Sequence, residues 1–224
     1  MPRLRPLLAA TLLLAAGCAP SADPAGWRPL FDGRSLAGWV PSGFDAEGPV
    51  RVEPEFRGGG PAILLHRGTT ATGITWTRGA ELPRQNYEVE LEAMRVEGGD
   101  FFCGLTFPVG REACTLVVGG WGGTVVGISR VDRVDAAENE TAREMEFADG
   151  RWYRIRLQVT PERLRAWIDN APVVDLALDG KALSLRPGPT YRSLPLGVAT
   201  YMTTGAIRGL RLRRLPAASA DLRP

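Results

Sequence analysis

The stretch NYEVELEAMRV, residues 86–96, alternates apolar and charged side chains with a period of two residues. Tyrosine, valine, leucine and alanine fall on one face, and three glutamates fall on the other: Glu88, Glu90 and Glu92. Because successive side chains of a β-strand point to opposite faces, this pattern predicts an antiparallel strand with one buried and one solvated face. The glutamates also suggest the paired carboxylates of a sandwich glycosidase, although an ordinary solvated strand face has the same composition.

Short segments of the same character follow along the chain, separated by turn residues. PVGR at 108–111 and DNAP at 169–172 indicate two of these turns. No segment keeps an apolar period of 3.6 residues, so helices should be brief. The sequence therefore predicts an all-β fold, a two-sheet antiparallel jelly-roll sandwich that forms a single domain over residues 27–215. Further strands are expected at residues 101–107, 113–118, 124–131, 151–160, 163–169, 173–178, 196–203 and 206–212.

The composition agrees with a turn-rich β-protein and limits the partners to be expected. The 224 residues include 27 glycines and 18 prolines, which favours many turns. The 27 basic and 25 acidic side chains nearly cancel, and two of the basic ones, Arg3 and Arg5, lie in an N-terminal signal. No basic stripe appears in the sequence, so we expect no nucleic-acid partner.

The N-terminal residues have the composition of a bacterial lipoprotein signal. Two arginines precede an apolar run at residues 7–14, and the small residues AAG at 15–17 lead to Cys18. The apolar run is too short to span a bilayer. We therefore expect a signal peptide over residues 1–17 and diacylation of Cys18. Ordinary secretory cleavage is the alternative, because Ala15 stands where lipoprotein signals most often have leucine.

The expected lipid anchor also sets the expected location. Residues 18–26 are rich in Ala, Ser, Pro and Gly and are interpreted as a flexible tether, and residues 216–224 are interpreted as a C-terminal tail. Ala19 after the cysteine, in place of aspartate, resembles the sorting signal of outer-membrane lipoproteins. We expect a protein that is lipid-anchored in the bacterial cell envelope and faces the periplasm or the surface, with the membrane as a partner.

The stretch WRPLFDGRSLAGW, residues 27–39, sets two tryptophans around a Phe-Asp-Gly turn. Its aromatic and leucine side chains are apolar anchors that hold an N-terminal segment against a sheet. This motif, and the chain that follows it as far as the closing strand at 207–212, resembles the 3-keto-disaccharide hydrolase family. The resemblance implies a concanavalin A-like jelly roll that binds a carbohydrate ligand and cleaves 3-keto-glycosides. A non-catalytic concanavalin-like carbohydrate-binding module is the alternative.

The implied chemistry needs one carboxylate base. A ketone at C3 of a sugar acidifies the proton on C2, so a base and donors to the developing enolate can expel the substituent at C1. Water then adds to the unsaturated sugar. A divalent cation such as calcium, bound through oxygen ligands, is a second way to hold the enolate. His66 is the only histidine, which excludes a metal site built from several histidines.

Two stretches supply candidates for the sugar site. In DFFCGLTF, residues 100–107, Asp100 and Thr106 lie where more typical members of the family carry an Asn-Ser-Gly strand along the pocket. In GGWGG, residues 119–123, Trp121 offers a flat ring on which a pyranose can stack. We predict Asp100 as a catalytic carboxylate and Thr106 and Trp121 as substrate-binding residues. A turn residue at position 100 and a flexible hairpin loop around Trp121 are the alternatives.

The segment from Asp132 to Thr141 concentrates oxygen groups with little apolar content. Glu138 and Glu140 are predicted as further catalytic carboxylates and Asn139 as a substrate-binding residue, or the group as ligands of a hard cation. A solvated acidic loop without a function is the alternative.

Two cysteines remain after Cys18, namely Cys103 and Cys114. They flank a short turn, and an oxidising compartment favours a disulfide between them across the hairpin. The alternative is a pair of small buried thiols.

Overall fold

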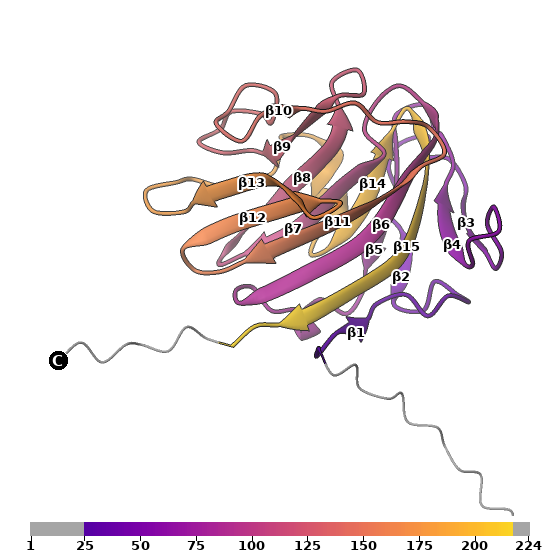
Figure 1. Cartoon of the computed structure of the whole chain (residues 1–224), viewed down its shortest axis with the longest axis horizontal. Coiled ribbons are helices and arrows are strands. Elements are labelled where there is room, and N and C mark those ends of the chain that lie inside the picture. The colour runs from indigo at the N-terminus through magenta and orange to yellow at the C-terminus, as the bar shows by residue number, and fades with distance from the viewer. Residues whose placement is uncertain (1–24, 217–224) are drawn as a thin grey trace, which may run out of the picture.

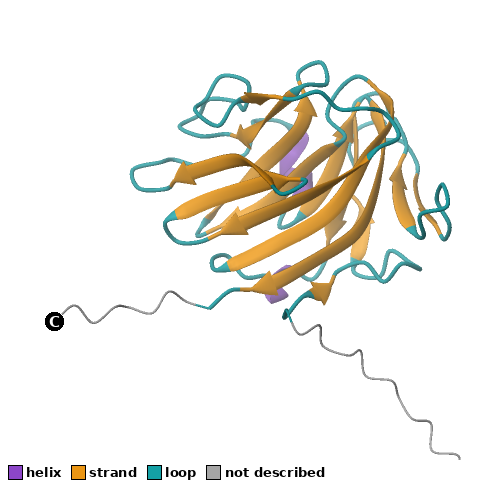
Figure 2. Ribbon diagram, in the orientation of Figure 1, coloured by secondary structure: helices purple, strands orange, loops and turns teal. Residues whose placement is uncertain are grey.

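Two antiparallel β-sheets pack face to face in the computed structural model, which describes residues 25–216 (Figures 1 and 2). The strands are β1 (Arg28–Pro29), β2 (Trp39–Pro41), β3 (Val50–Glu53), β4 (Ala62–Leu65), β5 (Ala71–Trp76), β6 (Tyr87–Gly98), β7 (Cys103–Val109), β8 (Glu112–Gly120), β9 (Val125–Ser129), β10 (Arg143–Glu144), β11 (Trp152–Val159), β12 (Arg163–Ile168), β13 (Ala171–Ala177), β14 (Gly197–Tyr201) and β15 (Thr203–Arg214). Two short 3-10 helices are η1 (Gly79–Glu81) and η2 (Pro189–Ser193). The predicted all-β sandwich is confirmed.

The two sheets have different strand orders. Sheet A runs β13-β12-β11-β6-β15-β4-β3, with β1 beside β15, and sheet B runs β10-β9-β8-β7-β14-β5-β2. No helix among residues 25–216 is long and apolar enough to cross a membrane. The expected signal peptide, the lipidation of Cys18 and nearly all of the expected C-terminal tail lie outside the described residues.

Strand β6 is the central strand of sheet A and confirms the strand predicted at residues 86–96. It pairs along its length with β11 on one side and with β15 on the other. Its apolar side chains lie in the core between the sheets, as the alternation predicts: Tyr87, Val89, Leu91 and Ala93. The inward residues of β11 and β12 extend the same core, because their sequences alternate in the same way.

Strand β7 contributes alternate side chains to the core from sheet B. Cys103, Leu105 and Phe107 are buried in the core, so Gly104 and Thr106 face outward. The alternation does not extend to the preceding residues. Phe102 packs in the core with its ring centroid 5.1 Å from that of Phe147, and Phe101 lies on the outer face instead.

The N-terminal motif folds as the aromatic anchors predict. The backbone N–H groups of Arg34 and Ser35 donate to Asp32 at 2.8 Å, which closes the turn and lowers the pKa of that carboxyl. Trp39 is buried, its ring lies edge-on to Trp76 at 5.0 Å, and its Nε1–H donates to the carbonyl of Leu30 at 2.7 Å. The segment is thereby attached to both sheets, since β1 pairs with β15 and β2 pairs with β5.

The glutamates on the outer face of β6 pair with arginines from the neighbouring strands β11 and β15. Glu90 accepts hydrogen bonds from Arg154 Nη2 at 2.7 Å and from Arg211 Nη2 at 2.5 Å. Burial by itself raises the pKa of Glu90, but these two hydrogen bonds outweigh it and hold the pKa below its usual value. Glu88 accepts from Gln158 and Arg213 in the same way. These buried glutamates are therefore paired with partly exposed arginines, and they are not a free pair of glycosidase carboxylates.

We expect Glu90→Gln to lower the free energy of unfolding at pH 7 by about 1–3 kcal/mol, because the hydrogen bonds from Arg154 and Arg211 lose the negative charge on their acceptor. The deficit should shrink as the pH falls below 4.5, the usual value for this carboxyl, and through its lowered pKa, since wild-type Glu90 then becomes neutral too. Glu92→Gln is the matched control. Its side chain is 37% exposed, against 6% for Glu90, so its effect should be smaller in urea unfolding.

The predicted disulfide is wrong. Cys103 and Cys114 are free and fully buried. The hairpin register pairs Cys103 with Val118 and Cys114 with Phe107, so the cysteines are offset by four residues along the ladder. That offset is about 13 Å along the strand direction, beyond the roughly 7 Å between Cα atoms that a disulfide spans. Burial raises the pKa of the Cys103 thiol to about 12 and raises that of Cys114 as well.

Thiol titration of a Cys18→Ser chain tests this arrangement. We expect no reaction with a thiol reagent at pH 8 in the folded protein, because both groups are buried and protonated. Unfolding in guanidinium chloride without reductant should release both thiols. Absence of reactive thiols under those denaturing conditions would mean that the cysteines are bonded after all.

Candidate functional site

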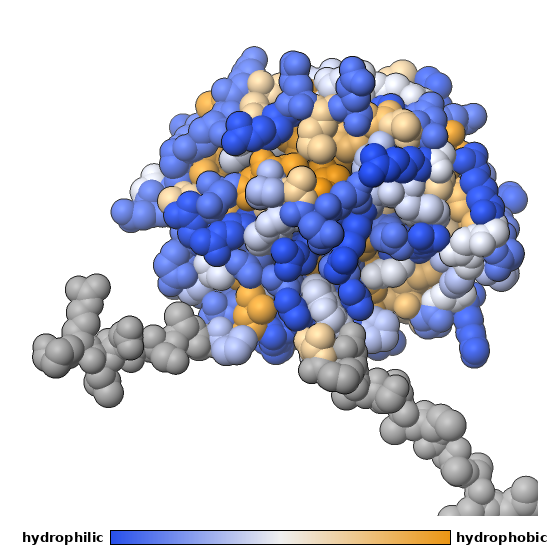
Figure 3. Space-filling view, viewed as in Figure 1, coloured by the Kyte–Doolittle hydropathy of each residue, from blue (hydrophilic) through white to orange (hydrophobic). Residues whose placement is uncertain are grey.

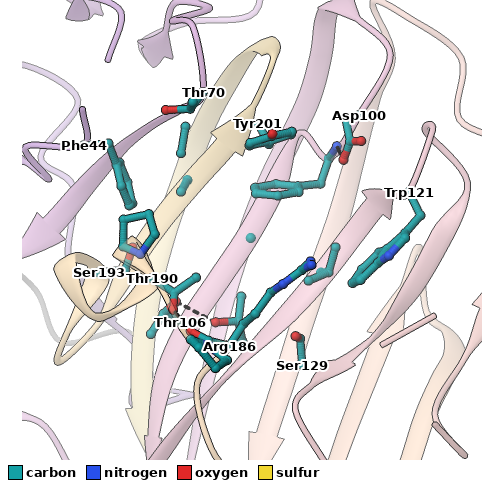
Figure 4. Close-up of a pocket in the computed structure, with 18 of the residues that line it drawn as sticks. Phe44, Thr70, Asp100, Thr106, Trp121, Ser129, Arg186, Thr190, Ser193 and Tyr201 are labelled. Atoms are coloured by element: carbon teal, nitrogen blue, oxygen red, sulfur yellow. Dashed lines mark hydrogen bonds between the residues drawn. The ribbon is translucent and has the colours of Figure 1, made fainter. Parts of the chain in front are cut away.

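A cavity of about 610 Å³ opens on the outer face of sheet B, away from the core (Figure 4). Its floor is the sheet itself, and its walls come from three places in the sequence. The first wall is the loop after β2 with the start of β5, the second is Phe101 with Tyr201, and the third is the segment from Arg186 to Ser193. Trp121 and Asp100 stand together at one rim.

The floor consists of cross-strand rows set by the register of sheet B. Thr106 lies opposite Gly197 on one side and Thr115 on the other, and Thr115 lies opposite Ser129. The hydroxyls of Thr106 and Thr115 are 2.9 Å apart and hydrogen-bonded. This row supplies hydroxyl groups to an otherwise mostly apolar floor. The next row is small or aliphatic: Ala199, Gly104 and Val117.

Glycine in the sheet lets aromatic rings form the walls. A Cβ atom at Gly104 would lie 3.0 Å from Cε2 of Phe101, so only glycine leaves room for that ring. Gly73 makes room for Phe44 in the same way, because a Cβ atom at Gly73 would lie 2.9 Å from Cε2 of Phe44. Phe101 in turn stacks on Tyr201 with a centroid separation of 5.8 Å. The result is an aromatic wall whose position depends on two glycines.

Trp121 occupies the turn between β8 and β9 and is 39% exposed at the cavity rim. Its own φ is +49°, and Gly122 and Gly123 next to it also have positive φ. At Gly120 a Cβ atom would meet Val117 at 2.7 Å. The turn and its packing thus account for Gly120, Gly122 and Gly123, and the turn presents the indole ring to the cavity.

Asp100 ties this turn to the neighbouring wall. One carboxylate oxygen accepts the backbone N–H of Phe101 at 2.7 Å, and the other accepts the N–H of Gly122 at 3.3 Å. Thr203 holds the backbone of Asp100 from the other side through its hydroxyl at 3.1 Å. The carboxylate lines the cavity and at the same time positions the loop that carries Trp121.

Arg186 is a site residue that the sequence did not reveal. Its guanidinium points toward the middle of the cavity, between Thr106 and Trp121 (Figure 4). It lies 5.6 Å from the Trp121 ring, in a cation–π arrangement, and its Nε is 3.5 Å from a carboxylate oxygen of Asp135. The same carboxylate accepts a hydrogen bond from Ser129 at 3.2 Å. A lone arginine in a Pro-rich loop carries no sequence signal, because only the fold brings it over the sheet.

The acidic segment lies beside the cavity and not in it. Asn139 donates to the carbonyls of Ile128 at 2.8 Å and Val134 at 3.0 Å, and its Oδ1 accepts from Thr141. Asn139 therefore holds the loop against β9, and it is not among the residues that line the cavity.

The two glutamates of that segment face away from the site as well. Glu140 pairs with Lys181 at 2.5 Å, and Glu138 is exposed. Neither lines the cavity, so the structure separates both predicted carboxylates from Asp100. Among residues 25–216, no group of three or more His, Cys, Asp or Glu side chains is arranged to hold a metal ion. Of the predicted site residues, Asp100, Thr106 and Trp121 are brought together.

Over residues 26–207 the sequence matches a family described as the 3-keto-alpha-glucoside-1,2-lyase-like domain. The chain belongs to this family. The resemblance noted from the tryptophan-bracketed motif is thereby confirmed. No protein of curated function matches the sequence.

Solved structures with the same sandwich are distant in sequence. Domain 4 of a GH43 extracellular arabinanase from Geobacillus stearothermophilus, in complex with arabinotriose, matches with a TM-score of 0.51 and 14% identity, over 79% of this chain and 82% of that one. A putative glycosyl hydrolase from Parabacteroides distasonis matches with 0.51 and 12%, over 86% and 95%. A CBM66 carbohydrate-binding module from Bacillus subtilis matches with 0.50 and 11%, over 79% and 95%. At these identities the likeness concerns the fold.

We expect Asn139→Ala to lower the free energy of unfolding by about 1–3 kcal/mol, because several hydrogen bonds, most of them partly buried, lose one partner. Glu138→Gln, one residue away and exposed, is the control and should stay within about 0.5 kcal/mol of wild type. Urea unfolding of both variants provides the measurement. An unchanged midpoint of urea unfolding for Asn139→Ala would contradict this structural role. Asn139 would then again be a candidate substrate-binding residue.

Proposed function

We propose that the protein cleaves 3-keto-α-glucosides in the sheet B cavity, with Asp100 as the base. The observation that carries the proposal is that a carboxylate, an exposed indole ring and a row of hydroxyls line one cavity in a chain of this family. The fold is shared with a domain whose structure contains arabinotriose and with a carbohydrate-binding module, which supports a carbohydrate ligand.

The proposed reaction is an elimination followed by hydration. The Asp100 carboxylate removes the proton on C2, and the electron pair of that C–H bond forms the enolate with the C3 ketone. The enolate then collapses, the C1–O bond breaks, and the leaving oxygen takes a proton to depart as an alcohol. Water adds across the resulting C1–C2 double bond and restores a 3-keto sugar. No step requires a second carboxylate on the opposite side of the ring.

The other groups in the cavity have distinct parts in this proposal. The ring of Trp121 stacks on the apolar face of the sugar and sets its height above the floor. The guanidinium of Arg186 and the hydroxyl of Thr106 are donors that stabilise the developing negative charge on the ketone oxygen. Donors fixed before the reaction lower the barrier because they need no reorganisation when the charge appears.

A carbohydrate-binding module without catalysis is the second candidate. It is favoured by one observation: both Asp100 oxygens already accept backbone N–H groups, as expected of a side chain that only anchors the Trp121 loop. The two candidates differ in whether substrate is consumed. Incubation of the purified protein with methyl 3-keto-α-glucoside, with detection of released methanol and 3-keto-glucose, separates them. Binding without release would favour the module.

Variants of the cavity sharpen that assay. If Asp100 is the base, Asp100→Asn should lower kcat by about 100-fold or more with a smaller change in KM. Trp121→Ala should instead raise KM by about 10- to 100-fold, since a stacked aromatic anchor is lost. Glu140→Gln is the matched carboxylate control outside the cavity and should leave both constants unchanged. A rise in KM at constant kcat for Asp100→Asn would reduce Asp100 to an anchor of the Trp121 loop.

We also propose that the protein is attached to the outer membrane through a lipid on Cys18. The support is the apolar run followed by AAGC at residues 15–18. Mass spectrometry of protein extracted from membranes should show a diacylated Cys18 at the N-terminus. An unmodified N-terminus would contradict the proposal.

A further inference from the structure

The outer face of sheet A carries a cluster of arginines that the fold assembles from segments far apart in the sequence. Seven arginines lie on this face, from β11 and β12 on one side of β6 and from β15 on its other side, together with the carboxylates of β6 and one from β13. We call it the arginine face. Its cations are Arg154 and Arg156 on β11, Arg163 and Arg165 on β12, and Arg208, Arg211 and Arg213 on β15, and its carboxylates are Glu88, Glu90, Glu92 and Asp175.

The charges on this face are layered. The side chains of Glu88 and Glu90 are 2% and 6% exposed, whereas their arginine partners project beyond them, with Arg154 at 47% and Arg211 at 34%. Seven arginines against four carboxylates leave this face with a net positive charge, and its exposed carboxylates are Glu92 at 37% and Asp175 at 54%. Figure 3, which shows this side of the molecule, has strongly hydrophilic side chains gathered across its lower half. Basic and acidic groups nearly balance over the whole chain, so this sign is a property of the face and not of the composition.

Aromatic rings hold several of the guanidinium groups in place. Arg211 and Arg213 lie over the ring of Trp27 at 4.7 and 4.6 Å, and Arg156 lies over Trp167 at 4.1 Å. A guanidinium that is stacked on a ring is held in position and loses less entropy on binding an anion, and Arg211 and Arg213 also donate to Glu90 and Glu88 beneath them.

The positive surface continues to the point where the chain enters the sandwich. A second cavity, of about 350 Å³, is lined there by residues of both ends of the domain, among them Arg28, Arg213 and Arg214 with Glu81. Both ends of the described chain leave the sandwich at this end, beside β1 and the end of β15 (Figure 1). Trp27, buried under two of the arginines, places the N-terminal connection at the edge of the same face.

We propose that the arginine face docks onto the anionic phospholipid headgroups of the membrane to which the protein is anchored. Guanidinium groups bind phosphate oxygens through paired N–H donors, and each basic residue near an anionic bilayer adds to the affinity. If Cys18 carries the lipid, residues 19–26 reach at most about 28 Å, so the face beside Trp27 is held near the bilayer. Sheet B, with its cavity, then opens away from the membrane.

The test uses the full chain with Cys18→Ser, so that no covalent lipid contributes to binding. Sedimentation with vesicles of phosphatidylcholine alone or with 30% phosphatidylglycerol measures the anionic component. We expect clear preference for the anionic vesicles, weakened in high salt. Arg163→Gln with Arg165→Gln should lower that affinity about 30-fold. This pair is chosen because it contacts the exposed Asp175 and not Glu88 or Glu90, so the fold is retained.

Arg67→Gln with Arg111→Gln is the matched control, which removes the same charge from exposed turns outside the face. It should keep most of the anionic-vesicle binding. Equal binding to both vesicle types would overturn the proposal, as would an equal loss in the control pair, which would reduce the effect to net charge. The outcome does not depend on whether the cavity is catalytic.

Discussion

The pairing of β7 with β8 and β14 is the constraint on which the site depends. Side chains alternate across a strand, so the register that buries Cys103, Leu105 and Phe107 also turns Gly104 and Thr106 toward the cavity. A slip of one residue would put phenylalanine on the floor and a hydroxyl in the core. The stability of the core and the chemistry of the floor therefore come from one set of backbone hydrogen bonds.

The loops above the floor are held by contacts that serve structure and site together. Asp100 joins the Phe101 wall to the Trp121 turn through its two carboxylate oxygens. The group proposed as the base is thus also the group that positions the stacking ring. This double role of Asp100 has an expected consequence for the kinetic constants of variants. If Asp100 is the base, loss of its charge lowers kcat, whereas loss of the loop position raises KM.

The strands with clean alternation were predictable from sequence, because period two is a local property. The strand at β6 and the hairpin of β7 and β8 follow from it. Asp100 was proposed from the family resemblance and Trp121 from its place among four glycines. The disulfide failed because it depends on register, and two cysteines near one turn are still four positions apart across the ladder. Arg186 could not be predicted as a site residue from the sequence for a related reason. Its loop lies far from β7 in the sequence and meets it only through the closed sheet.

The outward positions of the two sheets differ in composition, and the outer faces differ with them. In sheet B the outward positions are small or carry hydroxyls, which leaves a hollow, whereas in sheet A they carry carboxylates covered by longer arginines, which fills the surface. Each face is built on its own sheet, and the two sheets share a single apolar core. A partner bound to the arginine face therefore neither covers the cavity nor has to deform it. The proposed attachment and the proposed sugar chemistry therefore use different outward positions, because each face is built on its own sheet.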